Sequence, residues 1–446
     1  MHPLHTEWDA DVLGDDPLAF PGYSPPAEES VLTGRTRSYA LIHGRFDVVG
    51  GSMGAAHGER VVRAYRRAAE EGLPVVVVAS SGGARIQEGM LSLIQMARTA
   101  AAARAHADAG LLQVAVLRGP TTGGVLASYA GLADVRAAEP GVTVGFAGPR
   151  VAELVTGKRL PAGSHTAESA YQAGVVDAVV PRAAQPAWVE TALGLGEDEQ
   201  PAADRLSPPP TPAPGRTGAW DEVQQARHPG RTTGWGWAQR LCSQWTPLHA
   251  PDPCIRAGMA SLGGQRLVVV AMDRSRPGPR GYRLARRAIS LAGRLGLPLL
   301  TLVDTPGAEP GPEAEAGGIA GEIARTLAAM ANLAVASVSI CVGEGGSGGA
   351  LALAFSDRLL MLEHSVFSVI SPEAAAVILD RTEASAPQRA GHLKLTSGDL
   401  LSLDVIDEVI QETESALRRA VLRALAEARP GERHRRFDAA TAAWIR

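Results

Sequence analysis

The feature that most constrains this 446-residue chain is an internal repeat. Three glycine or proline pairs recur at offsets of 224, 225 and 223 residues: Gly72 with Gly296, Gly124 with Gly349, and Pro149 with Pro372. Such nearly constant offsets argue that one domain is duplicated, and the length is that of two or three domains. The chain must therefore build one fold twice.

Each copy shows the same order of apolar runs. A first run, at 74–79 or 298–304, ends in a glycine turn and is followed by a segment with helical spacing. A second run, at 111–117 or 336–342, ends in another glycine turn. Short buried runs that alternate with helices predict βαβ units, an α/β fold and a mostly parallel sheet. Ligands of such sheets bind at the carboxyl ends of strands, where these glycine turns fall.

A proline-dense segment, residues 201–218, separates the copies and is predicted to be a semi-extended linker. The predicted domains are therefore residues 1–200 and 219–446, and each is long enough for its own core.

Charge, cysteine content and hydropathy exclude several classes of protein. The net charge is -4, with no long basic run, so a nucleic acid partner is not expected. Three cysteines without a CxxC pair predict neither a disulfide framework nor a metal site. The start of the chain is acidic and polar, and no run reaches the roughly 18–20 uncharged apolar residues that span a bilayer. We therefore expect a cytoplasmic protein with no membrane segment.

The glycine turns themselves suggest a chemistry. A turn from a strand into a helix leaves the first helical N–H groups without intrahelical partners. Glycine lets a ligand approach these groups, and the helix dipole favours negative charge there. One such turn in each copy, at 123–124 and 348–349, predicts an oxyanion hole that can hold a thioester enolate without any side chain. The alternative is that these glycines only permit tight packing of strand and helix.

Two other motifs overlap the second of these turns. Residues 343–348 read GxGxxG, with Glu363 downstream, which matches a dinucleotide fingerprint. Residues 345–349 read GxSxG, with Asp380 and His392 downstream, which matches a nucleophile elbow. The first copy contains neither pattern. Both matches arise easily in a glycine-rich segment, so the shared glycine pair is the preferred interpretation.

Longer blocks resemble a known family. Blocks of the first copy resemble the β subunit of acetyl-CoA carboxylase carboxyltransferase: GGSMG (50–54), SGGARIQEG (81–89), PTTGGVLAS (120–128) and GFAGPRV (145–151). Blocks of the second copy resemble its α subunit: QQARHPGR (224–231), VDTPGAEPG (303–311) and GEGGSGGALA (343–352). The chain thus resembles a β–α fusion of the biotin-dependent carboxyltransferase type.

This resemblance implies two tandem crotonase-like domains of the ClpP/crotonase superfamily. It implies an enzyme that transfers a carboxyl group from carboxybiotin to the α-carbon of an acyl-CoA, as from acetyl-CoA to malonyl-CoA. A biotin carboxyl carrier protein and a biotin carboxylase would supply carboxybiotin in trans, and a homodimer or larger homo-oligomer is expected. The alternatives are a biotin-independent decarboxylase of a malonyl-type thioester and a non-catalytic homologue that binds acyl-CoA.

The resemblance also assigns site residues. Gly123 and Gly124 would hold the thioester oxyanion, and Gly348, Gly349 and Ala350 the ureido oxygen of biotin. The loops that would line the CoA side and its counterpart are Ser81, Gly82, Gly83, Ala84, Arg85, Thr305, Gly307 and Ala308. On charge alone Arg85 is either a phosphate contact or a helix-surface arginine.

Neither lysine lies in the Met-Lys-Met context of a biotin carrier. No cysteine precedes Cys242, so the four-cysteine zinc ribbon usual in the β subunit, and with it a metal, is not expected.

Overall fold

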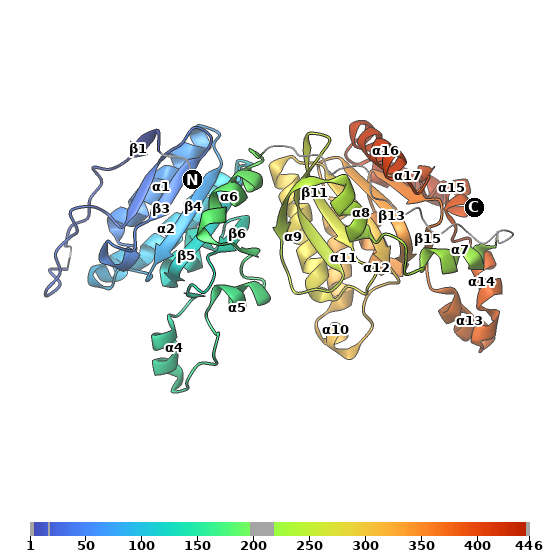
Figure 1. The fold of residues 1–446 in the computed structure, drawn as a ribbon, viewed down its shortest axis with the longest axis horizontal. Coiled ribbons are helices and arrows are strands. Elements are labelled where there is room, and N and C mark those ends of the chain that lie inside the picture. The colour runs from blue at the N-terminus through green and yellow to red at the C-terminus, as the bar shows by residue number, and fades with distance from the viewer. Residues whose placement is uncertain (1–3, 17, 197–217, 443–446) are drawn as a thin grey trace. The chain divides into compact units, whose positions relative to one another are not determined.

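The computed structural model describes residues 4–16, 18–196 and 218–442, and the chain divides into two compact units between Gly196 and Glu197 (Figure 1). The predicted linker, except Gly218, lies outside the described residues. Each unit contains one mixed sheet with helices on its faces. The predicted α/β architecture is confirmed in both.

The sheet of the N-terminal unit has the order β1-β2-β3-β4-β5-β6-β8, with β7 beside β5. Strands β1 to β3 pair antiparallel, and every pair from β3 onwards is parallel. The strands are β1 (Thr6–Trp8), β2 (Val31–Arg35), β3 (Ala40–Gly44), β4 (Val75–Ser81), β5 (Gln113–Thr122), β6 (Val135–Ala138), β7 (Val144–Gly145) and β8 (Ala178–Val179).

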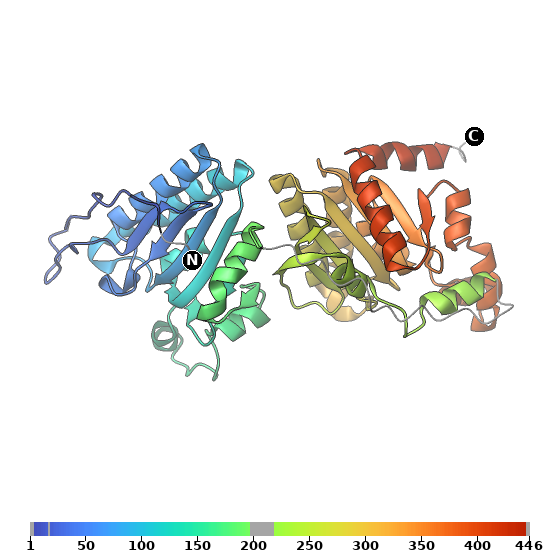
Figure 2. The same cartoon turned by 45° about the horizontal axis from the view of Figure 1, so that its top comes forward.

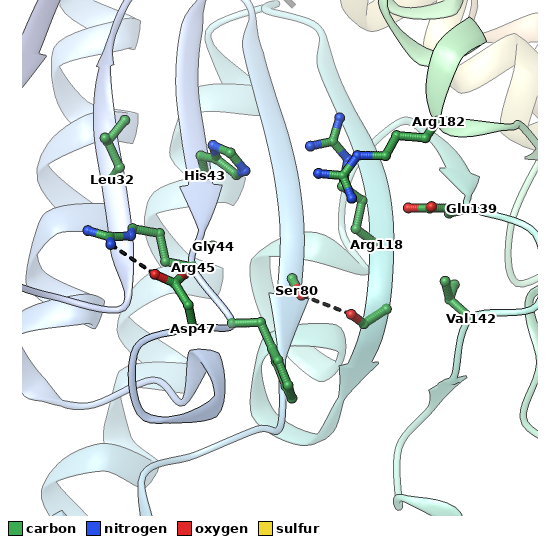
Figure 3. Close-up of a pocket in the computed structure, with 12 residues that line it drawn as sticks. Leu32, His43, Gly44, Arg45, Asp47, Ser80, Arg118, Glu139, Val142 and Arg182 are labelled. Atoms are coloured by element: carbon green, nitrogen blue, oxygen red, sulfur yellow. Dashed lines mark hydrogen bonds and ion pairs between the residues drawn. The ribbon is translucent and has the colours of Figure 1, made fainter.

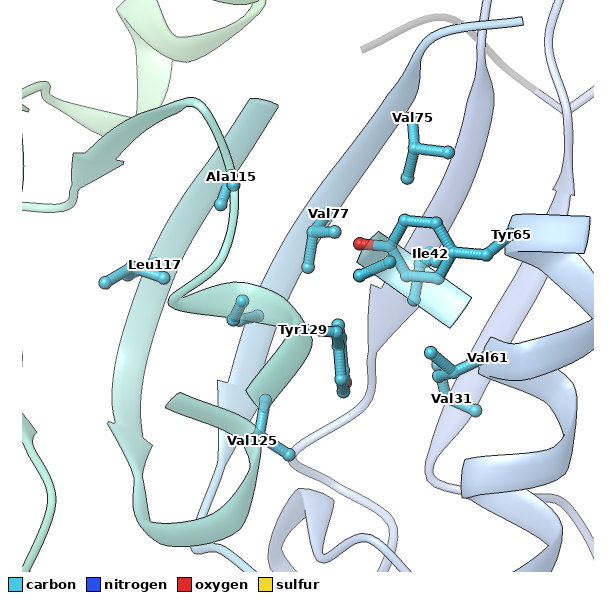
Figure 4. Packing of buried hydrophobic residues seen from close by; sticks show 14 of the residues in the cluster. Val31, Ile42, Val61, Tyr65, Val75, Val77, Ala115, Leu117, Val125 and Tyr129 are labelled. Carbon is cyan, nitrogen blue, oxygen red and sulfur yellow. The ribbon is translucent and has the colours of Figure 1, made fainter. Parts of the chain in front are cut away.

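The helices of this unit include α1, which packs one apolar face on the sheet. Val61 and Tyr65 of α1 meet Val31 and Ile42 of the strands in a closed core (Figure 4). Burial of such apolar side chains is the main source of stability, so this core holds α1 against the sheet. The helices are η1 (Val49–Gly51), α1 (Ala55–Glu70), η2 (Ile86–Glu88), α2 (Gly89–Asp108), α3 (Gly123–Val125), the π-helical η3 (Leu126–Ala130), α4 (Pro149–Thr156), α5 (Ala167–Gln172), η4 (Arg182–Ala184) and α6 (Gln185–Leu193).

The sheet of the C-terminal unit has the order β16-β14-β13-β12-β11-β10-β9, with β15 beside β13. It repeats the first sheet, with an antiparallel edge and a parallel centre. The strands are β9 (Ser243–Leu248), β10 (Ile255–Leu262), β11 (Gln265–Met272), β12 (Leu299–Thr305), β13 (Ser337–Gly346), β14 (Arg358–Leu362), β15 (Val366–Ser368) and β16 (Glu408–Ile410).

Helices α8 and α16 pack on one face of this sheet, as Figure 2 shows for α16. Their apolar side chains, with Trp237 among them, form a core with the strand residues. The helices are α7 (Ala219–Ala226), α8 (Gly234–Leu241), α9 (Pro279–Leu295), α10 (Pro312–Ala316), α11 (Ile319–Ala331), α12 (Ser347–Ala354), α13 (Pro372–Asp380), η5 (Glu383–Ser385), α14 (Ala386–His392), α15 (Ser397–Ser402), α16 (Glu414–Glu427) and α17 (Glu432–Ala442).

The two sheets show the repeat in their register. Equivalent positions at the strand ends share an offset of 224: Ser81 and Thr305, Thr121 and Gly345, and Gly83 and Gly307. The next turn keeps this offset, because Gly123 and Ser347 have φ values of 55° and 56°. Gly124 is therefore equivalent to Gly348. The sequence pairing of Gly124 with Gly349 is wrong by one residue, because both segments are glycine-rich.

Candidate active site

The loops after β4 and β12 are shaped by the same hydrogen bond. The N–H of Gly83 donates to Ser81 Oγ at 3.0 Å, and the N–H of Gly307 donates to Thr305 Oγ1 at 3.2 Å. Both glycines have positive φ, 113° and 126°, a conformation that favours glycine. Ser81 and Thr305 are buried, so these hydroxyls shape the loops.

The first glycine turn lies against the loop after β4. A Cβ added at Gly83 would lie 3.3 Å from Gly123 Cα and 3.5 Å from Gly124 N, so the two backbones are in close contact. A Cβ added at Gly124 would lie 3.5 Å from Ala84 N. The main chains of Ala84 and Gly124 are therefore neighbours at the start of α3.

Availability of the N–H groups distinguishes these residues. The N–H of Gly123 donates to the carbonyl of Phe146 at 2.9 Å, so this predicted donor is already used. Helix α3 has no side-chain cap. Outside hydrogen bonds internal to helices and strands, no described bond uses the N–H of Gly124 or Ala84. The N–H groups of Ala84 and Gly124, unlike that of Gly123, therefore have no such partner, although Gly124 is buried beside the Met96 side chain.

The second turn begins α12, which also lacks a side-chain cap. A Cβ added at Gly348 would meet no heavy atom within 4 Å, so the approach to this residue is open. Gly349 differs, since its added Cβ would lie 2.6 Å from Ala308 N, and Tyr282 Oη donates to its carbonyl at 2.9 Å. Glycine at 349 is thus required by packing, and Ala350 is fully buried. Gly348 is the approachable member of the predicted set.

The Arg85 guanidinium is bound inside the N-terminal unit. Its side chain is fully buried and forms ion pairs with Glu29 and with Glu88, the latter at 2.9 Å. It also donates to Ser30 Oγ and to the carbonyl of Ser52, both at 3.0 Å. Both sequence interpretations, a phosphate contact and a helix-surface arginine, are therefore wrong, because the guanidinium is used inside the unit.

A cavity of about 430 Å³ beside the loop after β12 contains the carboxyl group of Asp304, which lies in the block VDTPGAEPG but was given no chemical role from the sequence. Asp304 lines it and is 1% exposed. Burial raises the pKa of Asp304 to about 6, although the charges of Arg274 and Arg231 oppose this shift. The N–H of Glu344 donates to Asp304 Oδ1 at 3.3 Å. A buried carboxyl beside Arg274 is the kind of group that exchanges protons near neutral pH.

Arg227 closes the wall of the same cavity. It pairs with Glu344 and Glu373, each at 2.6 Å, and so joins α7, the end of β13 and α13. Burial raises the pKa of Glu373, but its hydrogen bond with Arg227 outweighs this and lowers it. The signal in the sequence was the run ARHPGR, which marks the segment without indicating its partners.

The catalytic triad implied by the nucleophile-elbow motif does not assemble among the described residues. Ser347 is exposed, whereas the Asp380 carboxylate is held by Arg389 and Ser385, and His392 contacts Arg389. No described hydrogen bond links this group to Ser347, so a serine triad is not formed. The carboxylate of Glu363 accepts the N–H of Glu412 at 3.0 Å.

Two other kinds of feature are absent from the described parts of the chain. None of the helices there combines the length and apolar character needed to cross a membrane. Nor do His, Cys, Asp or Glu side chains gather there in a group of three or more that could hold a metal ion.

The chain is similar to known proteins over most of its length. A family model described as acetyl co-enzyme A carboxylase carboxyltransferase-like matches residues 215–430, and a carboxyl transferase domain model matches residues 28–185. A Salinispora tropica protein named acetyl-coenzyme A carboxylase carboxyl transferase subunits beta/alpha is 44% identical over 399 residues, covering 83% of this chain and 70% of its own. A Mycobacterium bovis protein named probable biotin-dependent acyl-coenzyme A carboxylase beta3 subunit is 38% identical over 406 residues, covering 87% and 81%.

A solved structure extends the comparison to the fold. The crystal structure of transcarboxylase 12S superposes with a TM-score of 0.78 and 21% identity, covering 94% of this chain and 86% of that one. At this identity the likeness concerns the fold alone, and it confirms two tandem crotonase-like domains.

Proposed function

Since the chain belongs to the acetyl-CoA carboxylase carboxyltransferase family, whose activity is biotin-dependent carboxyl transfer to an acyl-CoA, we propose that two uncapped helix ends stabilise the oxyanions of this reaction. The observation that carries this proposal is that α3 and α12, at equivalent places in the two copies, begin at glycine turns without a side-chain cap. The relatives are named carboxyl transferases and carboxylases, so a decarboxylase or a non-catalytic homologue is not favoured.

In the N-terminal unit, Ala84 and Gly124 are the proposed donors. As the α-proton leaves an acyl-CoA, negative charge builds on the thioester oxygen. Two amides fixed by the backbone stabilise this charge without reorganising, which is the largest single contribution in many enzymes. The hydrogen bond that the Gly83 N–H donates to Ser81 Oγ holds the Ala84 loop in place, so Ser81 is a positioning residue.

In the C-terminal unit, Gly348 fits the ureido oxygen of biotin, because an added Cβ there would project into open space. Carboxybiotin supplies the carboxyl group when it is bound. The N–H groups of Gly348 and Gly349 would donate to its ureido oxygen at the positive end of α12. Tyr282 and the Ala308 backbone keep this helix end in place through their contacts with Gly349.

Substrate, partners and assembly complete the proposal. The name of the Salinispora tropica relative supports acetyl-CoA as the acyl-CoA. A carrier protein and a biotin carboxylase would act in trans. Exposed apolar side chains on α4 and α13 support a homodimer or larger homo-oligomer, because such surfaces mark interaction sites: Leu154, Val155, Ile378 and Leu379.

The test is carboxyl exchange between malonyl-CoA and biocytin. Gly348→Ala should place a methyl group where the ureido oxygen approaches and lower kcat/KM by about 10²-fold, the cost of a misplaced reactant. Gly398→Ala is the matched control, since its added Cβ also meets nothing within 4 Å. Equal activity of both variants would refute the role of Gly348, and CO2 release without biocytin would favour the decarboxylase.

A further inference from the structure

A second cavity, of about 610 Å³, lies in the N-terminal unit away from the glycine turn. Its strand residues His43, Ser80 and Arg118 alternate with core residues on the same strands: Ile42, Ala79 and Leu117. Because side chains alternate across a strand, the cavity lies on the face of the sheet that turns away from this core. Helix α3, which begins at the glycine turn of residues 123–124, contributes Val125 to that core. This turn therefore leads onto the core face of the sheet, opposite the face with the cavity.

Two arginines stand together in the cavity wall. Figure 3 shows the guanidinium groups of Arg118 and Arg182 beside one another. Arg118 Nε donates to Gln185 Oε1 at 2.9 Å, which leaves its terminal nitrogens for another partner. Neither arginine has an ion pair with any described residue, although Glu139 lines the same cavity.

The surroundings compensate these charges only in part. The pKa of Arg118 is lowered first by burial and then by the charge of Arg182, and the charge of Glu139 raises it by a smaller amount. The pKa of His43 is lowered first by burial and then by the charges of Arg118, Arg182 and Arg45, whereas the charge of Asp47 raises it. Arg45 itself is neutralised by Glu28 and Asp47. Like charges held together in this way are stabilised by an anion between them.

Size and lining define the ligand further. A volume near 610 Å³ is that of a small-molecule site and exceeds what a bare ion needs. Leu32, Phe46 and Val142 supply apolar contacts for an organic frame. We propose that this cavity binds a small organic anion, whose phosphate or carboxylate group is held between Arg118 and Arg182. Paired guanidinium groups suit such planar or tetrahedral oxyanions.

This anion has two possible sources, a free small molecule or the nucleotide phosphates of coenzyme A. Titration calorimetry of the full chain with inorganic phosphate and with malonate tests the site. We expect saturable binding with one anion per chain. Displacement of phosphate by coenzyme A would identify the nucleotide phosphates as the source, and its absence a free anion.

Variants locate the site. Arg182→Gln and Arg118→Gln should each weaken binding by about tenfold or more, the effect of losing a charge-assisted hydrogen bond. Arg182 is exposed, so R182Q should keep the fold, which circular dichroism checks. The control is Arg104→Gln, an exposed arginine of α2, which should bind as the wild type does. No saturable binding, or equal binding by R182Q, would overturn the proposal, whether or not carboxyl transfer is observed.

Discussion

Replacing Arg85 by Met should destabilise the N-terminal unit strongly. The side chains of Arg85 and Glu29 are 0% exposed, and that of Glu88 is 1% exposed. Removing the arginine leaves two buried carboxylates without their cation. Breaking a buried pair in this way costs about 3–5 kcal/mol of the free energy of unfolding, a large share of the usual 5–15 kcal/mol.

Urea unfolding of the full chain, followed by circular dichroism, measures this loss. The midpoint of the N-terminal unit should fall by about 1 M or more. Adding Glu29→Gln and Glu88→Gln to Arg85→Met should restore part of the stability, since no charge is then left unpaired. The matched control is Arg104→Met, whose exposed pair with Asp108 is worth at most about 1 kcal/mol.

The pH dependence gives a second readout. Burial raises the pKa of Glu29, but the hydrogen bond and charge of Arg85 outweigh it, so the folded pKa lies below 4.5. A depressed carboxyl pKa stabilises the protein above the unfolded value, and this contribution is lost as the pH falls. The difference between wild type and R85M should therefore be largest near neutral pH and shrink below about pH 4.5. An R85M protein of unchanged stability with a raised KM for acyl-CoA would refute this reasoning and make Arg85 a phosphate contact.

Two further predictions follow from single contacts. Burial raises the pKa of Asp304 to about 6 from 3.8, so the wild type should lose stability as the pH rises between these values. The free energy of unfolding of Asp304→Asn, measured in urea relative to wild type, should rise by about 1–3 kcal/mol between pH 4 and pH 7. A difference between the two proteins that stays constant with pH would contradict the raised pKa. Gly83→Ala should abolish most exchange activity because its Cβ presses on Gly123 at 3.3 Å. Gly72→Ala, also at positive φ but in open space, should keep activity and cost about 1 kcal/mol, and equal activity of the two variants would refute the contact's importance.

Local patterns were enough to predict two central strands of each sheet and the repeat. The run at 74–79 became β4, and that at 298–304 became β12, because β-branched and aliphatic side chains suit a buried parallel strand. The equivalent glycines Gly72 and Gly296 end α1 and α9 with φ of 66° and 67°, a conformation that only glycine adopts cheaply. Such requirements are local, so a single sequence displays them.

The predictions failed where partners are distant in sequence. Arg85 is 56 residues from Glu29, and nothing in either segment indicates that the two charges meet in the interior. The N–H of Gly123 is used by Phe146, which reaches it through the parallel pairing of β5 and β7. Spacing alone could identify the turn, but the choice of Ala84 and Gly124 as donors depends on contacts between loops.

The repeat also bears on the proposal that the two turns bind different ligands through the same kind of backbone site. Both copies place a hydroxyl, Ser81 or Thr305, under the loop that precedes the turn, so the two loops are held in the same way. The side chains nearby have diverged. One loop continues into the buried ion-pair network of Arg85 with Glu29 and Glu88, whereas the other borders a cavity with the titratable Asp304. A backbone site tolerates such divergence, because its donors are independent of side-chain identity. Selectivity between thioester and ureido oxygens must then come from the walls, and D304N should alter exchange more than any change at Arg85 that preserves folding.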